Sequence, residues 1–237
     1  MNYGKIENSN GVSVDQSLMK DGYLQLTQIA TPTAPASGKT IYYTKSDGKL
    51  YKIVNGGSET EVGASGGYKT LYVPASQITP RSDSGATPNY YESPTYKIHF
   101  ETLDFDPDVA QYSQFNVIMP EDWDRGTVKV KFSWMADTGT GNVVWCIQSQ
   151  ALTDSDAIDA TYGTAVTVTD NLTTLLDIQL SDATEAMTVA ATPALDDMIC
   201  FQVYRDKPNQ ASDTFTGNAR LISVFIQYNA TLTPTAW

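Results

Sequence analysis

The chain has very few of the residues that most often bind metals or form cross-links. Its 237 residues include one histidine, His99, and two cysteines, Cys146 and Cys200. A zinc site built from several histidines is therefore excluded, and two cysteines are too few for a disulfide framework. Each cysteine lies in an apolar, strand-like run. This placement favours a buried free thiol, although pairing of the two stays open.

Long hydrophobic runs are also missing. The longest unbroken apolar stretch, Val143 to Ile147, is far shorter than the roughly 20 residues that a membrane-spanning helix needs. The first ten residues lack the basic patch and the apolar run of a secretory signal. The sequence therefore predicts a soluble protein without a secretory signal, and one that does not bind membranes.

Recognisable catalytic and cofactor-binding motifs are scarce. The sequence has no GxGxxG, no GxxxxGK[ST] and no CxxC pattern. The acidic cluster Asp104 to Asp108 resembles the start of a calcium loop, but Val109 and Phe115 stand where that loop requires glycine and glutamate. We expect this cluster to be a turn with exposed carboxylates, and His99 to be a solvent-facing strand residue. No cofactor and no catalytic residue is predicted.

Charge is distributed unevenly along the chain. Residues 1–67 carry six lysines and six acidic residues, whereas residues 68–237 carry nine basic and 21 acidic residues, which accounts for the whole net charge of −12. An acidic body repels nucleic acid and anionic membranes. A neutral N-terminal part suits a segment that lies against another protein, although the asymmetry is equally consistent with solubility alone.

The first 67 residues predict an extended arm and a three-strand meander. The runs IYYTK, KLYKIV and SETEVG are separated by Asp47-Gly48 and Asn55-Gly56-Gly57, which supply the positive φ angles of tight hairpins. A meander of roughly 25 residues is below the size at which a core suffices without disulfides or metals. We therefore expect it to be stabilised by trimerisation or by docking, through Leu24, Leu26, Ile29, Ile41, Tyr42, Tyr43, Leu50, Tyr51 and Ile53.

A glycine-rich stretch, residues 63–67, marks a domain boundary, and the pattern beyond it predicts a β-sandwich. Apolar residues alternate with polar ones in eight or nine short runs, which are typical of an antiparallel jelly roll. One helical turn is expected at Asp154 to Asp159. The fold class is thus all-β, with residues 1–67 as arm and meander and residues 68–237 as sandwich. The expected strands centre on Leu71 and Val73, Ile98 and Phe100, Phe115 to Met119, Val128 to Trp134, Val143 to Ile147, Val166 and Val168, Leu176 to Leu180, Ile199 to Val203, and Leu221 to Tyr228.

Two long connections are candidates for recognition. Residues 74–96 contain Pro80, Pro88 and Pro94 together with Tyr90, Tyr91 and Tyr96, and residues 207–218 are polar around Phe215. Long connections without regular structure are usually functional or disordered, and tyrosine offers a large contact area at little entropic cost. Either these residues form exposed recognition loops, or they pack down on the sandwich as a lid.

Parts of the sequence resemble appendage proteins of tailed bacteriophages. Residues 31–63, TPTAPASGKTIYYTKSDGKLYKIVNGGSETEVG, are similar to a segment that recurs in those proteins. The tracts YKTLYVPASQITPR, FQVYRD and NARLISVFIQYNAT are similar to a jelly-roll domain that often follows it. The resemblance implies a homotrimer on the virion exterior, with the N-terminal region docked and the jelly roll outward. It transfers no catalytic residue.

Three functions follow as hypotheses. The first is a non-enzymatic, trimeric cement or head-fibre protein bound to the phage capsid. The second is a tail fibre or tail-tip adhesin that touches a glycan or protein of the host surface. The third is a free carbohydrate-binding or glycan-hydrolysing module, which the single histidine and the missing signal disfavour.

Overall fold

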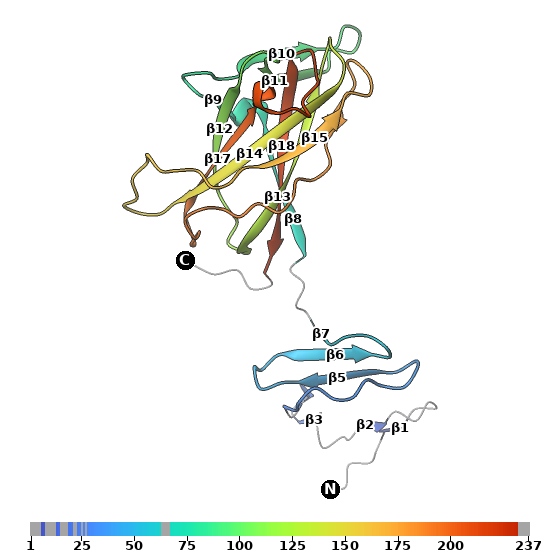
Figure 1. Cartoon of the computed structure of the whole chain (residues 1–237). Helices are drawn as coiled ribbons and strands as arrows, with labels where there is room; N and C mark the ends of the chain where they lie inside the picture. The colour runs from blue at the N-terminus through green and yellow to red at the C-terminus, as the bar shows by residue number, and fades with distance from the viewer. Residues whose placement is uncertain are drawn as a thin grey trace. The chain divides into compact units, whose positions relative to one another are not determined.

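A computed structural model describes residues 6–7, 13–14, 19–20, 23–24, 26, 28–62 and 67–231. The chain separates into two compact units, Met1–Ser65 and Gly66–Trp237 (Figure 1). Among the described residues, no helix is both long enough and apolar enough to cross a bilayer.

In the described residues of the N-terminal unit, the strands form three small antiparallel sheets. Two of them are ribbons of two-residue strands: β1 (Ile6–Glu7) with β2 (Ser13–Val14), and β3 (Met19–Lys20) with β4 (Tyr23–Leu24). The third is the expected meander of β5 (Thr40–Thr44), β6 (Leu50–Val54) and β7 (Thr60–Glu61). Gly48 and Gly56 have φ of +79° and +69°, a conformation that only glycine adopts easily in these turns.

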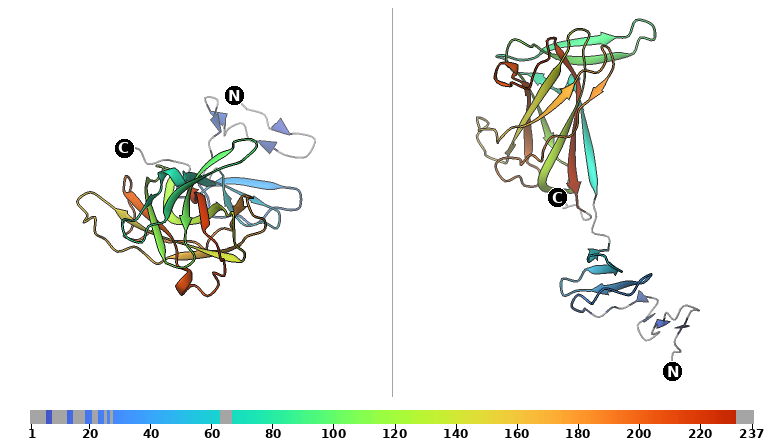
Figure 2. Two further views of the ribbon diagram at one scale, coloured as in Figure 1. Left: turned by 90° about the horizontal axis from the view of Figure 1, so that it is seen from above. Right: turned by 45° about the vertical axis from the view of Figure 1, so that its right-hand side comes forward.

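The C-terminal unit is a jelly-roll sandwich of two antiparallel sheets. One sheet has the order β10-β11-β18-β13-β16, with β8 also pairing β18, and the other has the order β15-β14-β17-β12-β9. Successive strands alternate largely between the sheets, so segments distant in sequence become neighbours (Figures 1 and 2). The elements are β8 (Tyr68–Pro74), η2 (Ala75–Gln77), β9 (Thr79–Pro80), β10 (Thr87–Glu92), β11 (His99–Phe105), β12 (Gln111–Ile118), β13 (Trp123–Met135), β14 (Asn142–Leu152), β15 (Val166–Asn171), β16 (Gln179–Leu180), β17 (Met198–Arg205), η3 (Lys207–Asn209) and β18 (Ala219–Ala230).

The core lies between the two sheets and is rich in aromatic side chains. Trp145 is fully buried and contacts the rings of Phe105, Phe132 and Trp134 at centroid distances of 5.3, 5.5 and 6.3 Å. The expected inward alternation of Val128 to Trp134 is confirmed, because all four apolar residues of that run are buried. Burial of such side chains contributes roughly 1.5–3 kcal/mol each to the stability of this unit.

Several local expectations are wrong. Asp154 to Asp159 forms turns without a helix. Ser133, a polar residue between Phe132 and Trp134 that strict alternation predicts to face solvent, is buried. Ile98 is 55% exposed because it lies in the turn of the β10–β11 hairpin, beyond the core. The connection at residues 74–96 has structure of its own, since it contains η2, β9 and β10.

Of the expected strand at Leu176 to Leu180, only Gln179–Leu180 forms, as β16, and here the alternation is reversed. Leu176, Ile178 and Leu180 are each at least 50% exposed, whereas Gln179 between them is buried. The Gln179 amide hydrogen-bonds Thr173 and the carbonyl oxygens of residues 174 and 177, so the polar residue satisfies a buried turn.

Candidate docking and recognition surfaces

The meander has little apolar interior of its own. Of its predicted docking residues, Tyr43 and Ile53 are buried, while Ile41, Leu50 and Tyr51 are half-buried. Strand pairing places Tyr43 opposite Tyr51, and their rings stack at a centroid distance of 5.9 Å. Tyr43 and Ile53 are the only buried large apolar side chains in the described part of this unit.

The opposite face of the meander leaves apolar side chains in contact with solvent. Tyr42 is 57% exposed and Val54 is 45% exposed, and Ile29 in the preceding arm is 46% exposed. Leu26 is half-buried, and the side chain of Leu24 lies outside the described residues. An uncovered apolar face on so small a sheet is typical of a surface that another chain covers.

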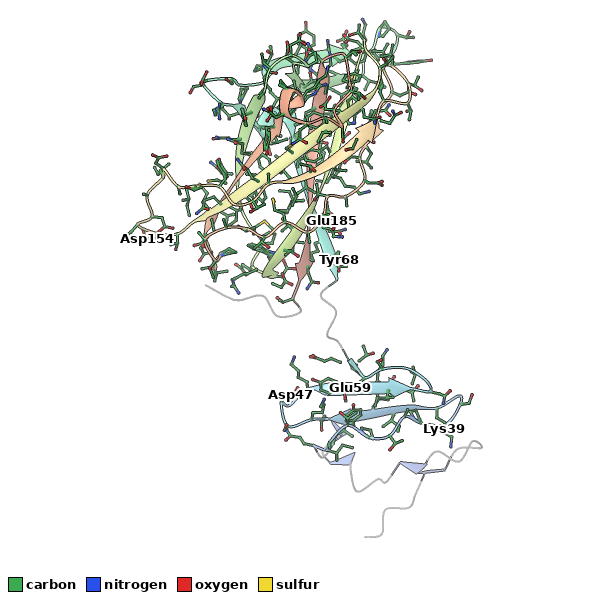
Figure 3. The ribbon with its side chains drawn as sticks, in the orientation of Figure 1. Lys39, Asp47, Glu59, Tyr68, Asp154 and Glu185 are labelled. Atoms are coloured by element: carbon green, nitrogen blue, oxygen red, sulfur yellow. The ribbon has the colours of Figure 1, made fainter. Side chains whose placement is uncertain are left out.

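Polar contacts on Glu59 join the arm to the meander. Its carboxylate accepts hydrogen bonds from Lys45 Nζ at 2.7 Å, from Thr31 Oγ1 at 2.7 Å and from the Tyr43 hydroxyl. The hydrogen bond from Lys45 is the main cause that lowers the pKa of Glu59 to about 2, followed by those from Tyr43 and Thr31. Figure 3 shows Glu59 within the small sheet and Asp47 at the turn between β5 and β6. Charge-assisted hydrogen bonds thus supply part of the order that a larger core would provide.

The β10–β11 hairpin carries the candidate recognition residues of the sandwich. Tyr90 is 64% exposed and stacks on the ring of His99, with centroids 5.4 Å apart and an interplanar angle of 20°. Pairing puts Tyr90 opposite Glu101 on the next strand. These residues line a hollow of about 620 Å³ with Ala75, Ser76, Ile78, Thr79, Pro80, Pro88, Asn89 and Thr102.

This hollow combines an aromatic surface with a few polar groups. Hydroxyls from Ser76 and Thr79, the carboxylate of Glu101 and the exposed ring of Tyr90 lie around an apolar floor. Such a combination is typical of a small-molecule or peptide-anchor site. His99 is solvent-facing as expected, but its stacking partner was not predicted, because it depends on the pairing of two strands.

The remaining predicted recognition residues differ in how far their side chains are exposed. Tyr96 is 84% exposed in the hairpin turn, and Tyr91 is half-buried. Phe215 does not belong to an exposed loop, because it is fully buried with its ring 5.4 Å from that of Trp134. Its carbonyl oxygen accepts a hydrogen bond of 2.7 Å from the buried guanidinium of Arg205, which pulls this connection into the sandwich.

The acidic cluster is also not a simple exposed turn. Asp104 is 4% exposed and accepts hydrogen bonds from Asn89 and Thr102 at 2.8 and 3.0 Å, while Asp108 is exposed. Within the described ranges, no group of three or more His, Cys, Asp or Glu side chains is arranged to hold a metal ion.

Both cysteines are free thiols. Cys146 is buried, and burial raises its pKa to about 12. Cys200 is half-buried on the outer face of β17, and burial raises its pKa as well. Neither thiol is activated as a nucleophile, because activation requires a lowered pKa.

Sequence reasoning missed the outer face of the five-stranded sheet. Glutamine and asparagine side chains recur there on three neighbouring strands, at every second residue. The signal was present as Gln148 and Gln150 in β14 and as Gln114 and Asn116 in β12. Only the register between the strands brings these amides together.

No family model and no curated protein matches this chain. Among solved structures, a cycloisomaltooligosaccharide glucanotransferase of Paenibacillus sp. aligns with 65% of this chain and 18% of its own length, at 12% identity and a TM-score of 0.40. The CBM22-2 xylan-binding domain of Paenibacillus barcinonensis Xyn10C aligns over 68% of this chain and 99% of that domain, at 14% identity and a TM-score of 0.42. A chain of infectious bursal disease virus, Gx strain, aligns over 78% of this chain and 41% of its own, at 8% identity and a TM-score of 0.32. These similarities assign the chain to no family.

Proposed function

We propose that this chain is a non-enzymatic structural protein of a tailed-phage particle, assembled as a homotrimer on the virion exterior. The N-terminal unit docks on the capsid as the foot of a cement or head-fibre protein, and the sandwich unit is displayed. The observation that carries the proposal is the composition of the meander, which buries two large apolar side chains and exposes Tyr42, Val54 and, in the arm, Ile29.

The meander gains less free energy from its own core than the ordering of its backbone costs. Burying Tyr43 and Ile53 contributes roughly 1.5–3 kcal/mol each, whereas ordering one residue of backbone costs roughly 1–2 kcal/mol. The described segment 28–62 has 35 residues. The free energy gained by burying two side chains is therefore smaller than the entropic cost of ordering this backbone. Covering the exposed apolar face with neighbouring copies or with capsid protein supplies the missing burial.

The oligomeric state tests the first half of the proposal. Light scattering on the purified full chain is expected to give the mass of three copies, and Tyr42→Asp is expected to shift it to one. Tyr72→Asp is the matched control, because Tyr72 is also 57% exposed but lies on β8 of the sandwich. A monomeric natural chain, or a Tyr42→Asp variant that stays trimeric, contradicts trimerisation through this face.

Location on the particle tests the second half. Antibody-labelled particles viewed by electron microscopy are expected to carry label over the capsid surface, and particles made with a chain lacking residues 1–65 are expected to carry none. Label confined to the tail would contradict the cement function and would support a tail-fibre function.

A second candidate function is receptor binding by a tail fibre or tail-tip adhesin. The exposed Tyr90–His99 stack beside Glu101 favours it, since exposed aromatic residues with neighbouring polar groups are typical of recognition surfaces. Fluorescent full chain is expected to stain host cells in this case, and Tyr90→Ala is expected to abolish the staining. If the Tyr90→Ala variant still stains host cells, recognition does not depend on the Tyr90–His99 hollow. A free carbohydrate-binding module, the third hypothesis, would bind host glycan without being found on particles.

A further inference from the structure

The outer face of the five-stranded sheet presents a row of amide side chains. The register places Gln150 of β14 opposite Cys200 of β17, and Cys200 opposite Asn116 of β12. The next row of the same face holds Gln148, Gln202 and Gln114 in the same strand order. Each amide offers both a donor and an acceptor, so the face can hydrogen-bond in either direction.

The connection between β14 and β15 turns this face into a cleft. It projects from the sheet at Asp154, as Figure 3 shows, and returns where the Gly163 N–H donates to the Ser149 carbonyl oxygen at 3.0 Å. Two hollows, of about 290 and 590 Å³, lie against it and share lining residues, among them Ile158 and Cys200. The two hollows therefore adjoin each other, which leaves room for a ligand that contacts both.

Hydrogen-bonding capacity inside the cleft is left unused. Gln150 is 8% exposed, and its amide nitrogen donates to the Ala151 carbonyl oxygen at 2.9 Å, while its amide oxygen has no partner among the described residues. The side chains of Gln114 and Asn116 likewise make no hydrogen bond to another described residue, and both line the smaller hollow. The Gln150 amide oxygen is therefore available to accept a hydrogen bond from a ligand or from water.

The charged side chains around the cleft limit the class of ligand that it can bind. The residues that line the two hollows include the carboxylates Asp154, Asp156, Asp159 and Asp196, and none of these lining residues is lysine or arginine. An anionic ligand is excluded by repulsion in this surrounding. Apolar walls from Leu152 and Ile158 and the half-buried ring of Tyr162 complete the cleft.

We infer that this cleft binds a neutral oligosaccharide. The amides of Gln114, Asn116 and Gln150 and the carboxylate of Asp159 hydrogen-bond sugar hydroxyls, which are both donors and acceptors. Ile158 and Tyr162 contact the apolar C–H faces of the sugar rings. The site is separate in its residues from the Tyr90–His99 hollow, and it does not depend on where the protein is attached.

The test uses fluorescent full chain on an array of neutral glucans, mannans, galactans and xylans, with sulfated and sialylated glycans beside them. Binding to at least one neutral oligosaccharide is expected, and calorimetry on that compound is expected to show affinity lower by about tenfold or more for Gln150→Leu and for Asn116→Ala. Tyr72→Ala is the control, because Tyr72 lies on β8 of the other sheet and is 57% exposed, and this variant is expected to bind as the natural chain does. No binding to any neutral glycan, or loss of binding in Tyr90→Ala alone, overturns the inference.

A second measurement locates the ligand independently of folding defects in variants. Cys200 lines both hollows, so its alkylation by iodoacetamide, followed by mass spectrometry, is expected to slow when the bound oligosaccharide is present. Unchanged alkylation at saturating oligosaccharide places the ligand elsewhere and overturns the inference. Protection of Cys200 by an arginine-rich peptide, with no protection by any neutral oligosaccharide, assigns the cleft to a cationic protein segment instead.

Discussion

Replacing Asp213 by Asn is expected to lower the free energy of unfolding of the sandwich unit by about 3–5 kcal/mol, because it leaves a buried arginine charge unpaired. Arg205 and Asp213 both have fully buried side chains. The Arg205 Nε and Nη2 atoms donate to the two carboxylate oxygens at 2.9 and 2.8 Å. Its other donors reach the carbonyl oxygens of Phe105, Phe215 and Gly217 at 3.1, 2.7 and 2.9 Å.

The expected loss of stability follows from the hydrogen bonds that asparagine cannot make in place of aspartate. Asp213 Oδ2 also accepts from the Val144 N–H at 3.0 Å, so both oxygens of the carboxylate are engaged. An amide keeps one acceptor and turns the other into a donor, which must then face another N–H group. Some buried ion pairs can be replaced by apolar residues without loss of stability. This pair also hydrogen-bonds main-chain N–H and C=O groups, which would lose their partners. Removing Arg205 in addition to Asp213 is therefore not expected to restore stability.

Urea unfolding followed by tryptophan fluorescence measures the effect on the full chain. The sequence places all four tryptophans outside the N-terminal unit, so the signal reports the sandwich. Asp137→Asn is the control, because Asp137 forms its ion pair with Arg220 at 2.7 Å with 39% of the side chain exposed. Such a pair contributes at most about 1 kcal/mol. Equal unfolding midpoints for Asp213→Asn and Asp137→Asn would refute the reasoning.

Three further outcomes are expected. The pKa of Glu59 lies at about 2, below its ordinary value of 4.5, so its stabilisation of the meander is present above pH 4.5 and is lost as pH falls toward 2. NMR spectra of the meander along this range check it, and Glu59→Gln is expected to reduce the pH dependence to the part that Asp47 contributes, whose pKa the Tyr51 hydroxyl lowers. Gly139→Ala is expected to destabilise the sandwich by about 2 kcal/mol in urea unfolding, because φ there is +99° and a Cβ would lie 2.6 Å from the backbone nitrogen of Gly217. Iodoacetamide is expected to modify Cys200 slowly and Cys146 only after unfolding, since burial raises the pKa of Cys146 to about 12; equal rates in the native chain would contradict the described burial.

Strand positions were largely predictable where side chains alternate strictly. In Val128 to Trp134, each apolar residue faces the core, because the strand is long and paired on both sides. The prediction failed at Ile178, where a two-residue strand is oriented by the hydrogen bonds of Gln179 rather than by apolar burial. Short elements have too little apolar area to set their own orientation.

The candidate sites were predicted less completely. The sequence left open whether the two long connections form exposed loops or pack on the sandwich. Tyr90 and Tyr96 are exposed, whereas Phe215 packs on the sandwich. The sequence could not decide this for Phe215, because its carbonyl oxygen is held by Arg205 of β17, ten residues earlier in the chain. The cleft lined by Gln114, Asn116 and Gln150 was not predicted from the sequence, because these side chains come from separate strands.

The sequence alone determined the class of fold, the extent of the small meander and its shortage of apolar residues. These properties depend on local composition, on alternation along a strand and on turn residues such as Gly48, which act over a few neighbours. Tertiary structure alone decided which side chains share a surface, as with Gln150, Cys200 and Asn116. Their proximity arises from strand register in a jelly roll, where pairing joins residues that the sequence separates by dozens of positions.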